Sequence, residues 1–221
     1  MQVLIVGASR GIGLELVRQY RADGAAVTAT VRDDAGRVAV AALGATPVTL
    51  DVADAAGASA LAWPLDGAAL DVVVYNAGVY GPRTSGLETP TMAEFDHVMH
   101  TNVLGAMRVL PQVVDVLAPG ARVAVVSSRM GAIGPRSSAS GWLYRASKAA
   151  LNSVLKDVSL VLHGRATCVA FHPGWVRTDM GGGGADIDPA TSVAGIRRTL
   201  AVLLPTDSGG FFNFDGTPIP W

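Results

Sequence analysis

The fold is decided by the stretch Val3-Leu4-Ile5-Val6-Gly7-Ala8-Ser9-Arg10-Gly11-Ile12-Gly13, near the start of a 221-residue chain. Four apolar residues predict a buried strand that stops at Gly7, and the amphipathic segment from Ile12 to about Asp23 predicts a helix. Glycines in the turn between them let the backbone approach a ligand closely. Amide N–H groups and the helix dipole at such a turn favour a bound pyrophosphate. The residues therefore predict a phosphate-binding unit of strand, turn and helix.

Short apolar segments alternate with helix-like segments along the rest of the chain. We expect further strands at residues 25–31, 47–50, 70–75, 121–127, 166–171 and 210–213. We expect helices at residues 53–63, 91–117, 141–163 and 189–204, with Pro64 closing the first of these. Such alternation predicts an α/β fold, a doubly wound parallel sheet of about seven strands flanked by helices. We expect residues 1–221 to form a single domain.

Composition narrows the class of protein. Half of the residues are hydrophobic and the mean hydropathy is +0.37, but the apolar segments are short, which indicates buried strands rather than membrane spans. We expect no secretory signal, and with Cys168 as the only cysteine we expect no disulfide, no metal site and a cytoplasmic location. The net charge is -1 and the arginines are scattered, so nucleic-acid binding is not expected.

Tyr144 and Lys148 lie one turn apart near the start of the expected helix at residues 141–163. A phenol keeps its proton until about pH 10, so it needs a nearby cation to exchange protons near neutrality. Lys148 can be that cation. The alternative is a surface pair that happens to share a helix face.

Motifs in a fixed order resemble those of the short-chain dehydrogenase/reductase superfamily. They are Gly-x-x-x-Gly-x-Gly at Gly7, Asn76-Ala77-Gly78, Asn102, Ser128, Tyr144-x-x-x-Lys148 and Pro173-Gly174. The stretches that begin at Val126, Tyr144 and His172 resemble more narrowly the C-factor and sniffer-type carbonyl reductases. This resemblance implies a Rossmann-type fold and an NAD(P)-dependent oxidoreductase with EC 1.1.1-type chemistry.

The resemblance also implies catalytic roles. Tyr144 is the expected general acid, and Lys148 is expected to lower the pKa of the phenol and to bind the nicotinamide ribose. Ser128 is expected to orient the substrate oxygen, with Ser127 as the alternative because strand alternation turns only one of them toward the cofactor. Asn102 is expected to hold a water in the proton path, or else to be a helical asparagine that faces a neighbouring helix.

The cofactor-binding residues follow from the same resemblance. Asp51 is expected to meet the adenine, and the Val176 amide and Thr178 hydroxyl to hold the nicotinamide carboxamide. The full set implied to bind the cofactor is Gly7, Ser9, Arg10, Gly11, Ile12, Gly13, Arg32, Asp51, Val52, Asn76, Ala77, Gly78, Tyr144, Lys148, Pro173, Gly174, Val176 and Thr178.

Charge at the end of the second expected strand favours NADPH over NADH. Val31 is followed by Arg32, with no acidic residue at Val31 to hold a free ribose 2'-hydroxyl. Arg32 and Arg10 suit a 2'-phosphate instead. The alternative is that both are solvated surface charges, or that Asp33 and Asp34 neutralise Arg32.

We therefore expect NADPH-dependent reduction of a small or medium carbonyl compound, reversible as alcohol oxidation. The alternative function is a cofactor-binding regulatory or signalling protein with little turnover. We expect Pro135–Gly141 to shape the pocket mouth and Gly181–Gly184 to act as a lid, and His172 is interpreted as structural. The resemblance implies a homodimer or homotetramer that pairs through the helices from Thr91 and Gly141. Candidate pocket residues are Met130, Ile133, Trp142, Trp175 and Met180.

Overall fold

The computed structural model describes residues 1–221, apart from the side chain of Ala60. The strands are β1 (Gln2–Val6), β2 (Ala26–Val31), β3 (Thr46–Thr49), β4 (Leu70–Tyr75), β5 (Leu117–Val126), β6 (Ala166–His172) and β7 (Phe211–Asn213). The α-helices are α1 (Gly11–Ala22), α2 (Asp34–Ala42), α3 (Ala55–Ser59), α4 (Met92–Met99), α5 (Gly105–Val113), α6 (Trp142–Val161) and α7 (Pro189–Val202). Shorter helical turns are η1 (Ala60–Leu65), η2 (His100–Leu104), η3 (Val114–Val116), η4 (Arg129–Gly131) and η5 (Pro205–Asp207).

The strands form one parallel sheet of seven strands in the order β3-β2-β1-β4-β5-β6-β7. Val3 of β1 pairs with Val27 of β2 on one side and with Val72 of β4 on the other. Strand order therefore reverses at β1, where the chain moves from β3 across to β4. This is the predicted doubly wound sheet, and a ligand crevice is expected beside such a reversal, at the carboxyl ends of the strands.

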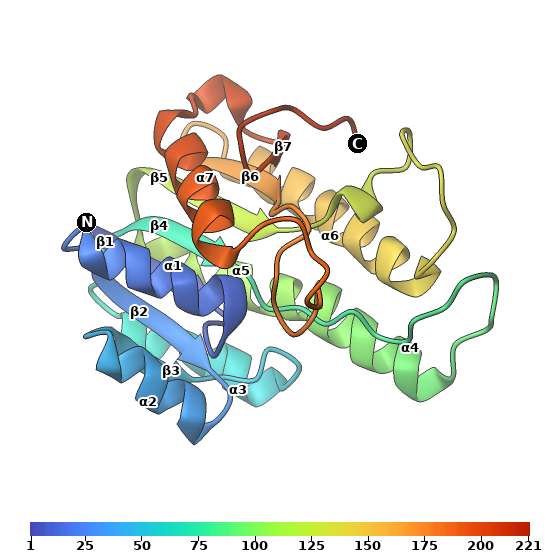
Figure 1. Cartoon of the computed structure of the whole chain (residues 1–221). Helices are drawn as coiled ribbons and strands as arrows, with labels where there is room; N and C mark the ends of the chain where they lie inside the picture. The colour runs from blue at the N-terminus through green and yellow to red at the C-terminus, as the bar shows by residue number, and fades with distance from the viewer.

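Helices cover both faces of the sheet (Figure 1). Period-two alternation sends Val73 and Tyr75 of β4 into one core and Val72 and Val74 into the other. The first core contains residues of α5 and α6, and the second contains residues of α1, α2 and α7. Cys168 is fully buried in the first core. Among the described residues, none of the helices is both long and apolar enough to cross a membrane.

The expected helix at residues 91–117 is confirmed over residues 92–116 as one unbroken helical segment, although not as a regular α-helix throughout. It begins as expected, because Thr91 and Glu94 form a capping box. It then widens into the π-helical turn η2 and ends with α5 and η3, so that β5 already starts at Leu117. At the wide turn the Tyr75 hydroxyl donates to the Thr101 carbonyl at 3.1 Å, which takes up a backbone acceptor of the helix. Such wide turns often occur at functional sites.

One other helix boundary differs from expectation, and one helix was not expected. Pro64 lies inside η1 and does not close the helix before it, because a short 3-10 turn needs few backbone donors. Helix α2 was not predicted; it is short, and Val40 is its one large side chain that is fully buried. The Asp33 side chain accepts from the Gly36 amide and caps this helix. An Asp three residues before Gly36 was the available signal.

Gly13 allows the first turn to close tightly. A β-carbon at this position would lie 2.1 Å from the Gly7 carbonyl oxygen and 2.7 Å from Asn76 Nδ2. We expect Gly13→Ala to lower the free energy of unfolding by about 2 to 3 kcal/mol, as overpacking does, and the melting temperature by about 5 °C or more. The matched control is Gly183→Ala, where a β-carbon meets nothing within 4 Å. Equal melting temperatures for the two variants would contradict this account of the turn.

Candidate active site and nucleotide cleft

Two connected cavities open at the carboxyl ends of the strands. The inner cleft, of about 410 Å³, runs from the turn at Gly7 past the ends of β1, β2 and β4 to Lys148. The outer cavity, of about 560 Å³, lies between Tyr80, Met130 and Trp175. Residues that line both are Ile12, Ser127, Tyr144, Pro173, Thr178 and Met180. Tyr144 therefore stands at the junction of the two cavities.

The inner cleft gathers most of the residues that were expected to bind a nucleotide. Those that line it are Gly7, Ser9, Arg10, Gly11, Ile12, Arg32, Asp51, Val52, Asn76, Ala77, Gly78, Tyr144, Lys148, Pro173 and Thr178. Gly174 and Val176 line the outer cavity instead. Gly13 is buried and lines neither cavity.

The glycine turn suits a phosphate group. Gly7 has φ +84°, and a β-carbon there would lie 2.7 Å from the Ala77 backbone, so only glycine fits. Asn76 Nδ2 donates to the Gly7 carbonyl at 2.7 Å and holds the turn. Helix α1 has no acidic residue in its first turn and no side-chain cap from Arg10. Helix α1 itself therefore supplies no carboxylate that would compete with an anion at its positive dipole end.

Two arginines flank the far end of the inner cleft. Arg10 Nη1 lies 2.9 Å from Asp179 Oδ2, and both side chains are largely exposed. The Arg32 side chain has no hydrogen bond or ion pair to the described residues. The acidic residues that follow it are used elsewhere, since Asp33 caps α2 and Asp34 pairs with Arg37 at 3.1 Å. Neither Asp33 nor Asp34 forms an ion pair with Arg32 in this structure.

Tyr144 is held by its neighbours in the first turn of α6. Its ring stacks on Tyr80 with centroids 4.6 Å apart. Gly141 precedes the helix with φ +66°, and a β-carbon there would lie 2.5 Å from the Tyr80 hydroxyl, so glycine makes room for this stack. Burial raises the pKa of Tyr144 to about 12, although a hydrogen bond with Ser128 opposes the shift. The phenol is therefore protonated near neutral pH.

Ser127 and Ser128 face different ways. Ser127 Oγ donates to Asn152 Oδ1 at 2.5 Å and is turned into α6. Ser128 lies beside the Tyr144 phenol, since its side chain opposes the rise of the Tyr144 pKa, and its hydroxyl accepts from the Met130 amide at 3.2 Å. Ser127 and Ser128 were the two alternatives, and Ser128 is the one beside the Tyr144 phenol.

Lys148 lies below Tyr144 on the same face of α6. Its ammonium donates to the Val126 carbonyl at 2.9 Å and lies 5.7 Å from the Tyr144 ring centroid. Burial lowers the pKa of Lys148 to about 8. Burial outweighs the other influences on the Tyr144 phenol, so the net shift of its pKa is upward and not the lowering expected from Lys148.

Asn102 ties three segments together within the wide turn η2. Its Oδ1 accepts from the Val79 amide at 2.8 Å, and its Nδ2 donates to the Val79 carbonyl and to Ser147 Oγ. A β-carbon on Gly78 would lie 3.3 Å from both Asn102 Oδ1 and Lys148 Nζ, so the asparagine and the lysine converge there. The side chain of Asn102 therefore positions the segment after β4 against α6.

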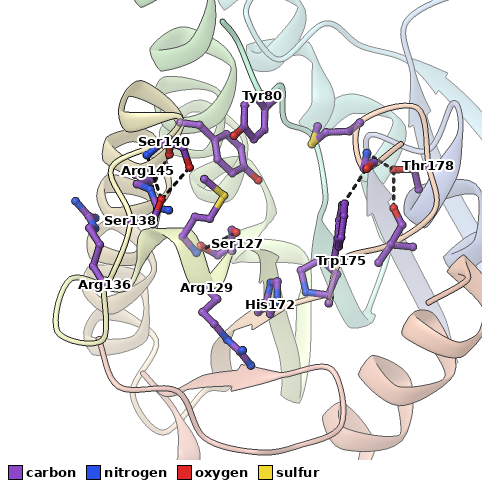
Figure 2. A pocket seen from close by; sticks show the side chains of 18 of the residues that line it. Tyr80, Ser127, Arg129, Arg136, Ser138, Ser140, Arg145, His172, Trp175 and Thr178 are labelled. Carbon is purple, nitrogen blue, oxygen red and sulfur yellow. Dashed lines mark hydrogen bonds between the residues drawn. The ribbon is translucent and has the colours of Figure 1, made fainter. Parts of the chain in front are cut away.

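The outer cavity contains part of the expected apolar pocket. Met130, Trp175 and Met180 line it, whereas Ile133 and Trp142 do not. The Trp142 indole donates instead to the Glu88 carbonyl at 3.0 Å. Figure 2 shows Tyr80, Trp175 and His172 around this cavity. Tyr80 and His172 were missed as pocket residues, although an aromatic residue just after Asn76-Ala77-Gly78 was an available signal for Tyr80.

Comparisons with known proteins agree with this geometry. A family model described as short chain dehydrogenase matches residues 1–185. The chain is 39% identical over 155 residues to the C-signal protein of Myxococcus xanthus, covering 69% of this chain and 93% of that protein.

Solved structures share the fold over the whole chain. A carbonyl reductase from Pseudomonas aeruginosa PAO1 in complex with NADP superposes with a TM-score of 0.87 at 32% identity, covering 100% of this chain and 99% of that one. The carbonyl reductase Sniffer of D. melanogaster also gives 0.87, at 30% identity with the same coverage.

Proposed function

The chain belongs to the short-chain dehydrogenase family, and from this premise we propose that it reduces small or medium carbonyl compounds with NADPH, with Tyr144 as the proton donor. Membership makes it an NAD(P)-dependent oxidoreductase. One observation supports the finer proposal: a protonated phenol beside Ser128 lies where the inner cleft meets the outer cavity. Nicotinamide chemistry needs such a proton donor beside the carbonyl.

The inner cleft is the proposed cofactor site. Its glycine turn and helix N-terminus would hold the pyrophosphate, while Lys148 and Thr178 line the end next to the outer cavity. When bound, NADPH would supply the hydride that reaches the carbonyl carbon.

The side chains supply the rest of the reaction. The Ser128 hydroxyl can hydrogen-bond the carbonyl oxygen and orient it toward the phenol. The Tyr144 phenol gives its proton to that oxygen as negative charge develops there, and the reverse transfer serves alcohol oxidation. The buried Lys148 ammonium stabilises the phenolate that remains, and Asn102 keeps the Val79 segment in place beside it.

The direct test is consumption of NADPH by the purified protein with a panel of aldehydes, ketones and quinones. We expect turnover above that of a Tyr144→Phe variant. The C-signal likeness favours a second function, a cofactor-binding signalling protein with little turnover. Binding of NADPH without turnover on the whole panel would favour that function over the reductase.

We expect the unpaired Arg32 to favour NADPH, and the NADP complex of the Pseudomonas aeruginosa relative supports this. Arg32→Gln should weaken NADPH binding about tenfold and leave NADH binding nearly unchanged, because only NADPH carries a 2'-phosphate. Both affinities are measured by titrating the protein with each cofactor and following the quenching of its tryptophan fluorescence. The matched control is Arg37→Gln, since Arg37 is paired with Asp34 and lies outside the inner cleft. Equal losses for NADPH and NADH would contradict the assignment.

The homodimer or homotetramer stays a proposal, supported by exposed apolar side chains on the helices implied to pair. Phe95 of α4 and Met107 of α5 are 44% and 51% exposed, and Leu160 of α6 is 63% exposed. The cytoplasmic location also stays a prediction.

A further inference from the structure

The outer cavity is lined by arginines without acidic counterparts. Arg83, Arg129, Arg136 and Arg145 line it, and none of its lining residues is Asp or Glu. The inner cleft differs, because Asp51 and Asp179 line it together with its arginines. The excess of positive charge is therefore a property of the cavity proposed to take the substrate.

Two of these arginines are already engaged. Arg83 donates to the Met180 carbonyl at 2.9 Å and lies over the Tyr80 ring at 5.0 Å. Arg145 is buried, and its Nε donates to the Ser140 carbonyl at 2.8 Å. These contacts are to carbonyl oxygens and an aromatic face, so they shape the cavity wall and leave its charge uncompensated.

Arg129 and Arg136 make no side-chain hydrogen bond or ion pair within the described part of the chain. Arg129 starts the turn η4 directly after Ser128, and Arg136 lies on the exposed segment that follows that turn. Figure 2 shows Arg129 beside His172, and Arg136 at the edge of the cavity. Two guanidinium groups that line this cavity are thus without a partner among the described residues.

His172 adds a second unsatisfied group beside Arg129. Its Nδ1 atom is buried without a hydrogen-bond partner. Burial and the positive charge of Arg129 lower the pKa of His172 to about 4, so the imidazole is neutral near pH 7 and can donate one N–H. Buried polar atoms are normally hydrogen-bonded, so this imidazole is an unsatisfied polar group in the wall of the cavity beside Arg129.

We propose that the carbonyl substrate carries an anionic group, a carboxylate or a phosphate, bound by Arg129 beside His172 with Arg136 at the cavity edge. This inference rests on the proposed reductase function and names its substrate class. A guanidinium binds both oxyanions through paired N–H donors, and no carboxylate in the cavity wall competes for it. Arg129, Ser128 and Tyr144 line the same cavity, so an anionic group bound by Arg129 would keep the substrate in the cavity that also contains the phenol.

Matched aldehydes test the proposal in steady-state kinetics with NADPH. The substrates are para-formylbenzoate and para-formylphenyl phosphate, compared with the neutral para-formylbenzamide, and the corresponding meta isomers. We expect kcat/KM for an anion to exceed that for the amide about tenfold at low salt. Added KCl should reduce this ratio. Whichever of the two anions has the larger ratio of kcat/KM to that of the amide identifies the site as one for a carboxylate or one for a phosphate.

Arg129→Gln should bring the ratio of anion to amide close to one. The matched control is Arg198→Gln, because Arg198 is an exposed residue of α7 that lines neither cavity. The anion-to-amide ratio of kcat/KM for Arg198→Gln should equal that of the wild type. Melting temperature and NADPH affinity of both variants show that they are folded.

The possible failures are distinguishable. Equal kcat/KM for anions and amide, or an anion-to-amide ratio that is unchanged in Arg129→Gln, would overturn the anion site. Neither result would contradict the proposed reductase function. No turnover of any aldehyde would contradict the reductase. The anion site is then tested by calorimetry with NADPH present, using terephthalate against terephthalamide. Tighter binding of terephthalate that Arg129→Gln removes would support the site, and equal or absent binding would overturn it.

Discussion

Tyr144→Phe is expected to lower kcat/KM for carbonyl reduction by about 10²- to 10⁴-fold, the range that a positioned general acid contributes. The substitution removes only the phenolic oxygen and keeps the ring that stacks on Tyr80 at 4.6 Å. The melting temperature and NADPH affinity should therefore stay close to those of the wild type. Because the pKa of Tyr144 is about 12, the wild-type phenol holds a proton to donate throughout the neutral range.

Tyr80→Phe is the matched control for this prediction. Tyr80 lines the same outer cavity and stacks on the same ring, but the Ser128 hydrogen bond belongs to Tyr144. We expect Tyr80→Phe to retain most of the activity. A large loss of activity in Tyr80→Phe with normal turnover in Tyr144→Phe would show that Tyr80 is the proton donor and would contradict its assignment to Tyr144.

Lys148→Met is expected to lower kcat/KM by about 10²-fold or more, because the phenolate formed in each turnover loses its neighbouring cation. Methionine keeps the unbranched apolar stem in a site where Lys148 is 3% exposed. The ammonium's bond to the Val126 carbonyl is also lost. Steady-state kinetics, with circular dichroism as the check on folding, measures the effect.

A pH profile separates the charge of Lys148 from its packing. Burial lowers the pKa of Lys148 to about 8, so the ammonium is present below that pH and is lost as the pH rises above it. We expect wild-type kcat/KM to fall above about pH 8 and this fall to be absent from the residual activity of Lys148→Met. If the fall persists in the variant, another group titrates and Lys148 does not supply the charge.

The sheet was predictable from the sequence because its strands contain short apolar runs, of which those of β1 and β4 stop at Gly7 and Asn76. Parallel pairing and helices on both faces followed from the alternation of segments. The π-helical turn within the expected helix at residues 91–117 was not predicted from the apolar spacing; in it the Thr101 carbonyl accepts from Tyr75, 26 residues away. Helix α2 was not predicted because it buries little apolar surface.

The candidate site was predictable as a set of residues, and its internal contacts were not. Spacing placed Tyr144 and Lys148 on one face of a helix, but the raised pKa of Tyr144 comes from burial by the fold around it. The choice between Ser127 and Ser128 required the contact of Ser127 with Asn152. The charge of the outer cavity is likewise a tertiary property, since Arg83 and Arg129 come from segments far apart in the sequence.

Transfer of deuterium tests the central claim most directly. The protein is incubated with NADPH that is deuterated at the transferable hydrogen and with an aldehyde that the panel shows to be consumed, and the alcohol is analysed by mass spectrometry. The reductase proposed here predicts an alcohol that carries one deuterium on the former carbonyl carbon, formed by the wild type and greatly reduced in Tyr144→Phe. An alcohol without deuterium, or deuterium transfer at the wild-type rate in Tyr144→Phe, would contradict it.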